Sequence, residues 1–410
     1  MHTQSVAGST SLRALDALNF FLADVRDGVG PYLAIYLLAS RSWSAGDIGI
    51  AMASMSVATL LAQTPAGALV DAVAARRLLM GLASTVVAVA CVMMTWFEGL
   101  WPVVIAQAMI GVAVAVLAPG VAAITLGLVG YRGLSRRTGR NEAFNHAGNI
   151  AAAVCAGLIG HYVAREGIFY LVAVFALFSV VSIACVKPDE IDVRLARGEQ
   201  AGHDEGPGRL AALLADRRVL VLAAAVTLFH FANAAMLPLV GQYLSLGRNS
   251  AASLYMSACI IVAQLVMIPV AVAAGRLAER WGRRPVFMIG FAALPLRGVA
   301  YALSDHPVWL VAVQMLDGIG AGVFGVLIVL MVSDLTRGTG RFNVTQGALA
   351  TATGLGAAAS NLSAGFIVER FGYGATFCML AGVAAVALSV FALGVPETAT
   401  PVVAGPTHTR

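Results

Sequence analysis

The chain has 410 residues, of which 59% are hydrophobic and only 11% are charged, and its mean hydropathy is +0.85. Soluble proteins carry about 25% charged residues, so this composition excludes an ordinary water-soluble protein and indicates a membrane protein. The net charge of +5 does not indicate nucleic-acid binding, because most of the 26 basic residues lie in short polar segments between apolar runs.

Twelve apolar runs follow one another, each long enough to cross a bilayer as a helix. The sequence therefore predicts an all-α membrane protein with twelve transmembrane helices in two six-helix bundles. Basic residues gather in every second connecting segment, which predicts a plasma-membrane protein, in a bacterium the inner membrane, with both termini in the cytoplasm. The predicted spans are residues 12–38, 46–71, 77–97, 100–129, 142–163, 167–186, 218–245, 251–274, 285–304, 307–333, 342–368 and 373–395.

The polar segments define the expected domain organisation. A long polar stretch lies between the sixth and seventh spans and is predicted to be a solvated linker. The predicted parts are a cytoplasmic N-terminus at 1–11, an N-terminal bundle at 12–186, a cytoplasmic linker at 187–217, a C-terminal bundle at 218–395 and a cytoplasmic tail at 396–410.

The first span carries three charged residues within its apolar run. Asp24 and Asp27 lie three residues apart and share a helix face, whereas Arg26 points elsewhere. A Gly-Val-Gly-Pro segment follows at 28–31 and predicts a local helix break. Because a charge at mid-bilayer is costly, we predict that these residues bind the substrate or carry a coupled proton. The alternative is a structural ion pair that holds this helix against its neighbours.

One short phrase occurs twice, between spans 2 and 3 and again between spans 8 and 9. Each copy has a glycine, an acid and a basic pair where one apolar run ends and the next begins. Internal repetition of hydrophobic bundles is typical of secondary transporters, which rock one half against the other, so we predict two pseudo-symmetric halves. The phrase comprises Gly67, Asp71, Arg76 and Arg77 in the first copy, and Gly275, Glu279, Arg280, Arg283 and Arg284 in the second.

Two charged positions break this repeat. Asp24 aligns with Asn233 in the second half, and Asp317 aligns with Ile110 in the first half. A charge kept in one half only favours a specific role, so we predict that Asp317 also binds substrate or couples protons. Arg297 lies at a comparable depth, and a purely structural role beside Asp317 is the alternative.

Further polar residues on the inner spans are predicted to line the transport pathway, with an interhelical hydrogen bond as the alternative at each position. No Walker phrase, nucleophile elbow or metal-ligand cluster occurs, so the sequence predicts neither an enzyme, nor a cofactor, nor a metal site. The residues predicted to line the pathway are Tyr32, Gln107, Asn145, His146, Asn149, His230, Asn233, Gln264, Gln314 and Asn361.

With its duplicated phrase and twelve spans, the chain resembles the major facilitator superfamily over essentially its whole length. The family motif runs Gly-x-Leu-x-Asp-Arg-x-Gly-Arg and then Lys or Arg. The second copy departs from it at Glu279, and the first copy has alanines in place of its central basic residues and glycine. The resemblance implies alternating access, with the acid and arginines of the phrase forming a cytoplasmic gate. Two family signatures are missing: span 4 has Gln107 instead of arginine, and span 5 lacks a Gly-Pro motif.

We therefore expect a monomeric secondary active transporter that moves a small organic solute across the plasma membrane and is coupled to protons. Efflux is favoured over uptake because the many apolar positions of the expected cavity suit amphipathic compounds. The first alternative is a proton-coupled uptake symporter for a polar organic acid or zwitterion. The second is a membrane sensor or receptor that keeps the fold without transport.

Overall fold

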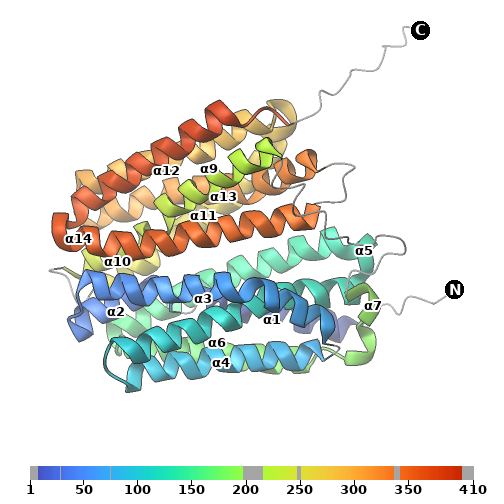
Figure 1. Ribbon diagram of the computed structural model, residues 1–410. Coiled ribbons are helices and arrows are strands. Elements are labelled where there is room, and N and C mark those ends of the chain that lie inside the picture. The colour runs from blue at the N-terminus through green and yellow to red at the C-terminus, as the bar shows by residue number, and fades with distance from the viewer. Residues whose placement is uncertain are drawn as a thin grey trace, which may run out of the picture.

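The computed structural model of the chain describes residues 8–27, 29–73, 75–196, 216–246, 251–336 and 342–398 (Figure 1). The predicted N-terminus, linker and tail lie partly outside these ranges. For Asp27 and Asp71 the structure describes the backbone but not the side chain. The first half contains α1 (Ser9–Asp27), α2 (Pro31–Arg41), α3 (Ala45–Ala72), α4 (Arg76–Trp96), α5 (Leu100–Tyr162) and α6 (Glu166–Ala184), followed by η1 (Pro188–Glu190) and α7 (Val193–Ala196). The second half contains α9 (Arg217–Ala234), α10 (Met236–Ser245), α11 (Ala252–Arg280), α12 (Arg283–Leu303), α13 (Pro307–Leu335) and α14 (Phe342–Gly394).

These helices make twelve passes in two bundles. Ten helical stretches of the described chain are long and apolar enough to cross a membrane. One of them, Thr345–Gly394, contains two passes that meet at a kink at Gly372. A further pass is formed by α1 and α2, which are separated by the predicted break at Gly30. The predicted fold, twelve transmembrane helices in two bundles, is confirmed.

The polar segment between spans 4 and 5 corrects one expectation. The sequence predicts a connecting loop between residues 129 and 142, but this is wrong, because α5 is helical on both sides of a kink at Gly130 and continues to Tyr162. Gly130 has φ of 62° and Gly372 has φ of 79°, and both values lie in the left-handed region that favours glycine. Single glycines therefore redirect the chain where polar loops were expected to do so.

Close helix crossings occur at equivalent places in the two halves. A Cβ atom added to Gly148 of α5 would lie 2.0 Å from the backbone oxygen of Phe20 in α1. A Cβ atom added to Gly356 of α14 would lie 2.3 Å from the backbone oxygen of Thr227 in α9. Small residues allow membrane helices to approach closely, and these two crossings are separated by about half the chain. The sequence repeat is thus also a repeat of packing.

The two bundles meet through α3 with α14, α5 with α11 and α2 with α10. We call the end that carries α2 and α10 the far end, and the end where α1 begins and α14 finishes the terminal end. At the far end, the carboxylate of Glu369 in α14 accepts a hydrogen bond of 2.8 Å from the Gly46 N–H of α3. Nearby, a Cβ atom on Gly49 would lie 2.7 Å from the backbone oxygen of Asn361. From this contact α3 and α14 diverge toward the terminal end (Figure 1).

Replacing Gly148 or Gly356 by alanine is expected to destabilise the protein, because the added methyl group would overlap a backbone oxygen of a neighbouring helix. Overpacking of this kind costs about 1–3 kcal/mol. A lower melting temperature of the purified variants in detergent measures this effect. Gly382→Ala is the matched control, because a Cβ atom there meets nothing within 4 Å. Equal melting temperatures for all three variants would contradict the close crossings.

Candidate functional site

A buried ion pair lies inside the C-terminal bundle. Arg297 of α12 is only 1% exposed, and its Nη1 atom lies 2.6 Å from Oδ1 of Asp317 in α13. The same Nη1 atom donates a hydrogen bond of 2.6 Å to the side chain of Asn233 in α9, and Nε donates one of 3.1 Å to the hydroxyl of Tyr301. A charge in hydrocarbon persists only when it is paired or hydrated, and here three helices supply the partners of one arginine. The pairing of Arg297 with Asp317, which the sequence left open, is therefore present.

A cavity of about 170 Å³ adjoins this pair. Asp317 reaches it with 20% of its side chain exposed. The cavity wall also includes His230, whose ring centroid lies 5.4 Å from that of Phe229 and 4.8 Å from that of Phe324. A cation, a carboxylate, an amide and aromatic rings thus surround one small volume. This combination suits an amphipathic molecule with one polar end and one apolar end.

The charged residues of the first span are seen only in part. Asp24 is half-buried on α1, and its carboxylate is close enough to act electrostatically on the hydroxyl of Tyr32 and the thiol of Cys91. Arg26 is also half-buried, and the Asp27 side chain lies outside the description. Arg297 lies on α12, whose counterpart in the first half is α4. The first half has Asp24 near Cys91 of α4, whereas the second half has Asn233 beside Arg297.

Tyr32 joins the two bundles instead of lining an open cavity. It is 5% exposed, and its hydroxyl oxygen lies 2.7 Å from Oγ of Ser257 in α11. Tyr32 therefore links the first span to α11 of the C-terminal bundle across the bundle interface.

The other residues predicted to line the pathway fall into three groups. His146 of α5 and Gln264 of α11 meet across the bundle interface, with Nδ1 and Oε1 2.8 Å apart. Gln107 and Gln314 do not line a cavity in this conformation, because they are 3% and 0% exposed and are buried between helices. The remaining predicted residues are half-buried, and they are Asn145, Asn149, His230, Asn233 and Asn361.

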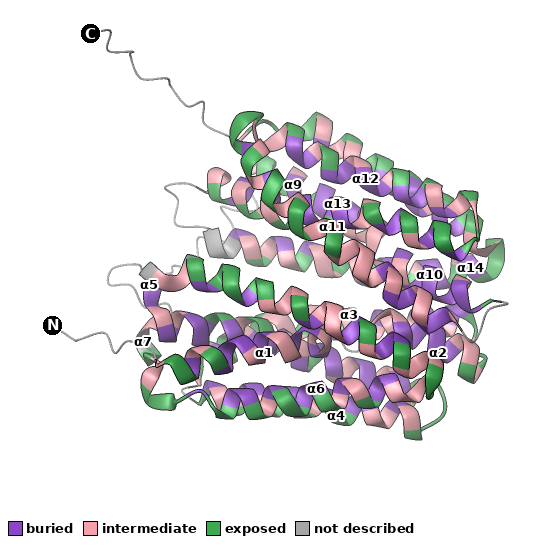
Figure 2. Cartoon of the chain, turned by 180° about the vertical axis from the view of Figure 1, so that it is seen from behind, coloured by how far each residue is buried: buried purple, intermediate pink, exposed green. Residues whose placement is uncertain are grey.

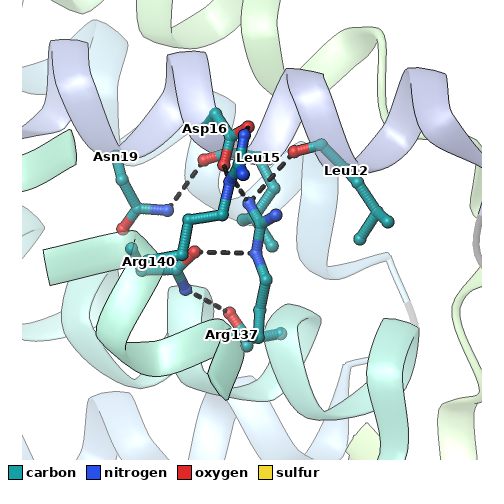
Figure 3. Close-up of polar contacts among 8 residues, drawn as sticks. Leu12, Leu15, Asp16, Asn19, Arg137 and Arg140 are labelled. Carbon is teal, nitrogen blue, oxygen red and sulfur yellow. Dashed lines mark hydrogen bonds and ion pairs between the residues drawn. The ribbon is translucent and has the colours of Figure 1, made fainter. Parts of the chain in front are cut away.

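Sequence reasoning missed a second charged cluster, which lies in the N-terminal bundle (Figure 3). Asp16 of α1 is 6% exposed and accepts hydrogen bonds of 2.7 Å from both Arg137 and Arg140 of α5. Arg137 also donates to Asn141 at 2.9 Å, and Asn141 donates to the hydroxyl of Thr125 at 3.0 Å. The two arginines resemble topology signals in the sequence. Their spacing of three residues on one helix, opposite an acid in the first span, is the signal that could have identified the cluster.

In this conformation the repeated loop phrase makes contacts within its own bundle. Arg77 donates to two carbonyl oxygens at the end of α6, at 3.1 and 2.6 Å. Arg283 lies 3.1 Å from the carboxylate of Asp334 in α13, and Arg284 donates to the carbonyl oxygen of Ala392 in α14. These contacts tie the helices of one bundle together at the terminal end. The gate role of the phrase stays a prediction.

Known proteins share both the sequence pattern and this architecture. A sequence profile described as the Major Facilitator Superfamily matches residues 15–272 and 260–408 of the chain. The chain belongs to the Major Facilitator Superfamily. Two proteins named as uncharacterized MFS-type transporters, from Mycobacterium tuberculosis strains CDC 1551 and H37Rv, are each 49% identical to it over 389 residues. These alignments cover 94% of this chain and 93% of the relatives.

Solved structures of this superfamily show the same fold. Two crystal structures of the nucleoside transporter NupG, one of them of a point mutant, superpose with TM-scores of 0.78 and 0.79. They cover 93% of this chain and 98% of NupG at 16% sequence identity, so the likeness is one of fold. As a member of the superfamily, the protein is a multi-pass membrane transporter of a small solute.

Asp317→Asn is expected to destabilise the C-terminal bundle, because Arg297 would remain buried without a counter-charge. Removing one partner of a buried ion pair costs about 3–5 kcal/mol, and the partial exposure of Asp317 places the effect at the lower end of this range. The double variant with Arg297→Gln removes both charges and is expected to recover a large part of the loss. Thermal unfolding of both single variants and the double variant measures this coupling. Additive losses would contradict the pairing.

Proposed function

We propose that this superfamily member is a proton-coupled secondary transporter of the plasma membrane that moves a small organic solute by alternating access. The observation that carries this proposal is the Arg297–Asp317 pair at the wall of a cavity, at a depth where the first half has only Ile110. A carboxylate in such a site exists either ionised and paired or protonated and neutral. It can therefore exchange a proton for another ligand during the transport cycle.

Efflux of an amphipathic cation fits this geometry through competition for Asp317. The cationic group of the solute and a proton both bind the exposed part of the same carboxylate, so one leaves when the other arrives. The rings of Phe229, His230 and Phe324 offer apolar and cation–π contacts to the remainder of the solute. Competition for one carboxylate makes solute and proton move in opposite directions, which is antiport.

Uptake of an organic acid or zwitterion is the alternative, and the same pair supports it through Arg297. An acidic group on the solute binds the guanidinium in place of Asp317, and a proton that enters with the solute neutralises the displaced carboxylate. Asn233, which also binds Arg297, holds the guanidinium during this exchange. Solute and proton then move together, which is symport. The sign of the proton movement distinguishes the two schemes.

The first span completes the proposed machinery. Asp24 and Arg26 are half-buried on α1, and Asp27 follows one turn after Asp24, so this helix offers a second set of groups for substrate or proton. The bond between Tyr32 and Ser257 gives this region a direct contact with the C-terminal bundle. A change of charge at Asp24 can therefore alter the contact between the bundles.

The distribution of basic residues supports the orientation. Arg76, Arg77, Arg283 and Arg284 all lie at the terminal end, where α4 and α12 begin, and this supports a cytoplasmic location for that end. In this orientation the bundles are closed at the outer face. The repeated loop phrase lies at the inner face, as a gate formed in the opposite state requires.

Proteoliposomes that contain a pH-sensitive dye test the proposal with three chemically distinct probes: tetraphenylphosphonium, benzoate and uridine. Uridine is included because a nucleoside transporter shares the fold. We expect one of these probes to drive proton movement with the wild type, and the movement to fall at least about tenfold in Asp317→Asn, because an amide does not titrate. Asp24→Asn and Asp27→Asn test the first span in the same way.

Asp189→Asn, an exposed change in η1, is the control and should leave the proton signal unchanged. A probe that is transported with normal proton movement in Asp317→Asn, Asp24→Asn and Asp27→Asn would remove these carboxylates from the coupling mechanism. Binding of a probe without movement of probe or protons would favour the sensor alternative.

A further inference from the structure

A groove on the outer surface of the N-terminal bundle lies away from the proposed transport site. It has a volume of about 530 Å³ and runs between α4 and α6, and it is bounded at one end by the segment that follows α6. We call it the α4–α6 groove. Leu78 and Leu82 on its α4 side are 64% and 56% exposed, and Gly81 between them leaves open space where another side chain would stand. Exposed residues continue along this outer face of α4 and α6 (Figure 2).

The position of the groove in the bilayer follows from the helices that form it. α4 begins at Arg76 and α6 ends at Ala184, so the groove opens at the terminal end, where these helices leave the hydrocarbon. Its aliphatic walls extend from this level into the membrane. A molecule that fills it therefore has a polar part at the membrane surface and an apolar part beside α4 and α6.

The polar end of the groove is basic. Arg76 and Arg77 both line it, and no acidic residue is among the lining residues that the structure describes. Arg77 is held in place by the carbonyl oxygens of Ile183 and Ala184, to which Nε and Nη2 donate. Three acids lie on the segment that bounds the groove. Asp189 and Asp192 are exposed to solvent, and hydrogen bonds from the Ser11 hydroxyl and the Gly8 N–H lower the pKa of Glu190. Arg76 is only 2% exposed and donates to the carbonyl oxygen of Val70, so Arg77 is the residue that presents positive charge to a ligand in the groove.

We propose that the α4–α6 groove binds one anionic phospholipid of the leaflet at the terminal end. Its phosphate lies at Arg77, near the first turn of α4, where the N-cap residue is Ala75 and supplies no side-chain acceptor to the helix N–H groups. One acyl chain lies along Leu78, Gly81 and Leu82. Basic pockets between membrane helices at this depth favour acidic headgroups, because electrostatic attraction there adds to the burial of the chain.

Native mass spectrometry of the full-length protein in detergent, titrated with phosphatidylglycerol or phosphatidylcholine, tests this proposal. We expect the wild type to retain one phosphatidylglycerol at concentrations where phosphatidylcholine does not bind. Arg77→Gln should weaken phosphatidylglycerol binding about fivefold, the effect of one basic residue near a membrane surface. Arg77→Lys should keep most of the affinity because it keeps the charge.

Gly81→Phe tests the apolar half of the site without removing any charge. The new ring enters open space, so the helix is expected to fold normally, and it should block the bound lipid. Gly382→Phe is the matched control, since Gly382 is exposed on α14 with equally open surroundings, and it should bind lipid as the wild type does.

Three results would overturn the proposal. The first is equal affinity of the wild type for the two lipids. The second is unchanged phosphatidylglycerol binding in both Arg77→Gln and Gly81→Phe. The third is weaker binding of inorganic phosphate in Arg77→Gln together with normal phosphatidylglycerol binding in Gly81→Phe, which would indicate a phosphate site alone.

Discussion

A charge that is removed from water is costly unless it is paired, and this constraint governs the three most buried ion pairs among the described residues. The pairs Arg297–Asp317, Arg137–Asp16 and Arg283–Asp334 each join helices of a single bundle. Breaking a buried pair leaves an uncompensated charge and is expensive, so Arg137–Asp16 and Arg283–Asp334, which take no part in the proposed exchange at Asp317, are suited to stay intact through a transport cycle. These two pairs favour movement of each bundle as a whole.

The contacts between the bundles are of another kind. Tyr32 bonds to Ser257, and His146 bonds to Gln264, so neutral or weakly basic groups meet at the interface. The carboxylate of Glu369 binds a backbone N–H at a helix start that water can also solvate. A typical hydrogen bond contributes only about 0.5–1.5 kcal/mol net, because water replaces it when the interface opens. Strong contacts inside the bundles and weak contacts between them are the arrangement that rocking requires.

The halves share their packing but differ in their charges. Gly148 and Gly356 make equivalent close crossings, so one packing scheme serves both bundles. The charged network around Arg297 occurs in the second half, and the Asp16 cluster occurs in the first. A symmetric scaffold with asymmetric charges allows one bundle to hold the exchangeable group of the proposed mechanism while both bundles move.

The sequence predicted the helices well because long apolar runs and duplicated loops are strong signals. The predicted helix break before Pro31 is also present in the structure, since two glycines and a proline so close together disfavour a continuous helix. The face that each helix turns toward its neighbours could not be predicted. A lipid-facing surface is as apolar as the core, so the helical periodicity of hydrophobic residues disappears from the sequence. Gln107 and Gln314 were therefore predicted to line a cavity, but the structure buries them between helices.

The candidate site was only partly predictable, because residue types can be read from the sequence but helix orientations cannot. Asp317, Asn233 and His230 were singled out by residue type, and the structure brings all three to one cavity. The sequence raised a pairing of Asp317 with Arg297 only as an alternative, whereas the bond from Arg297 to Asn233 and the Asp16 cluster depend on which helices are neighbours, which a single sequence does not show. The polar residues after Gly130 suggested a loop, because a polar segment between two apolar runs is normally read as a connection outside the membrane. A helix can also extend beyond the membrane, and α5 does so here.

The central claim, rigid bundles closed at the far end by weak contacts, is tested most directly by distance measurements between spin labels. One pair of labels at Ser42 and Arg370 reports on the far end, and another at Arg136 and Glu279 reports on the terminal end, in a variant without native cysteines. We predict that Tyr32→Phe combined with Glu369→Gln lengthens the first distance and shortens the second in the same fraction of molecules. Unchanged distances, or two distances that lengthen together, would contradict the account.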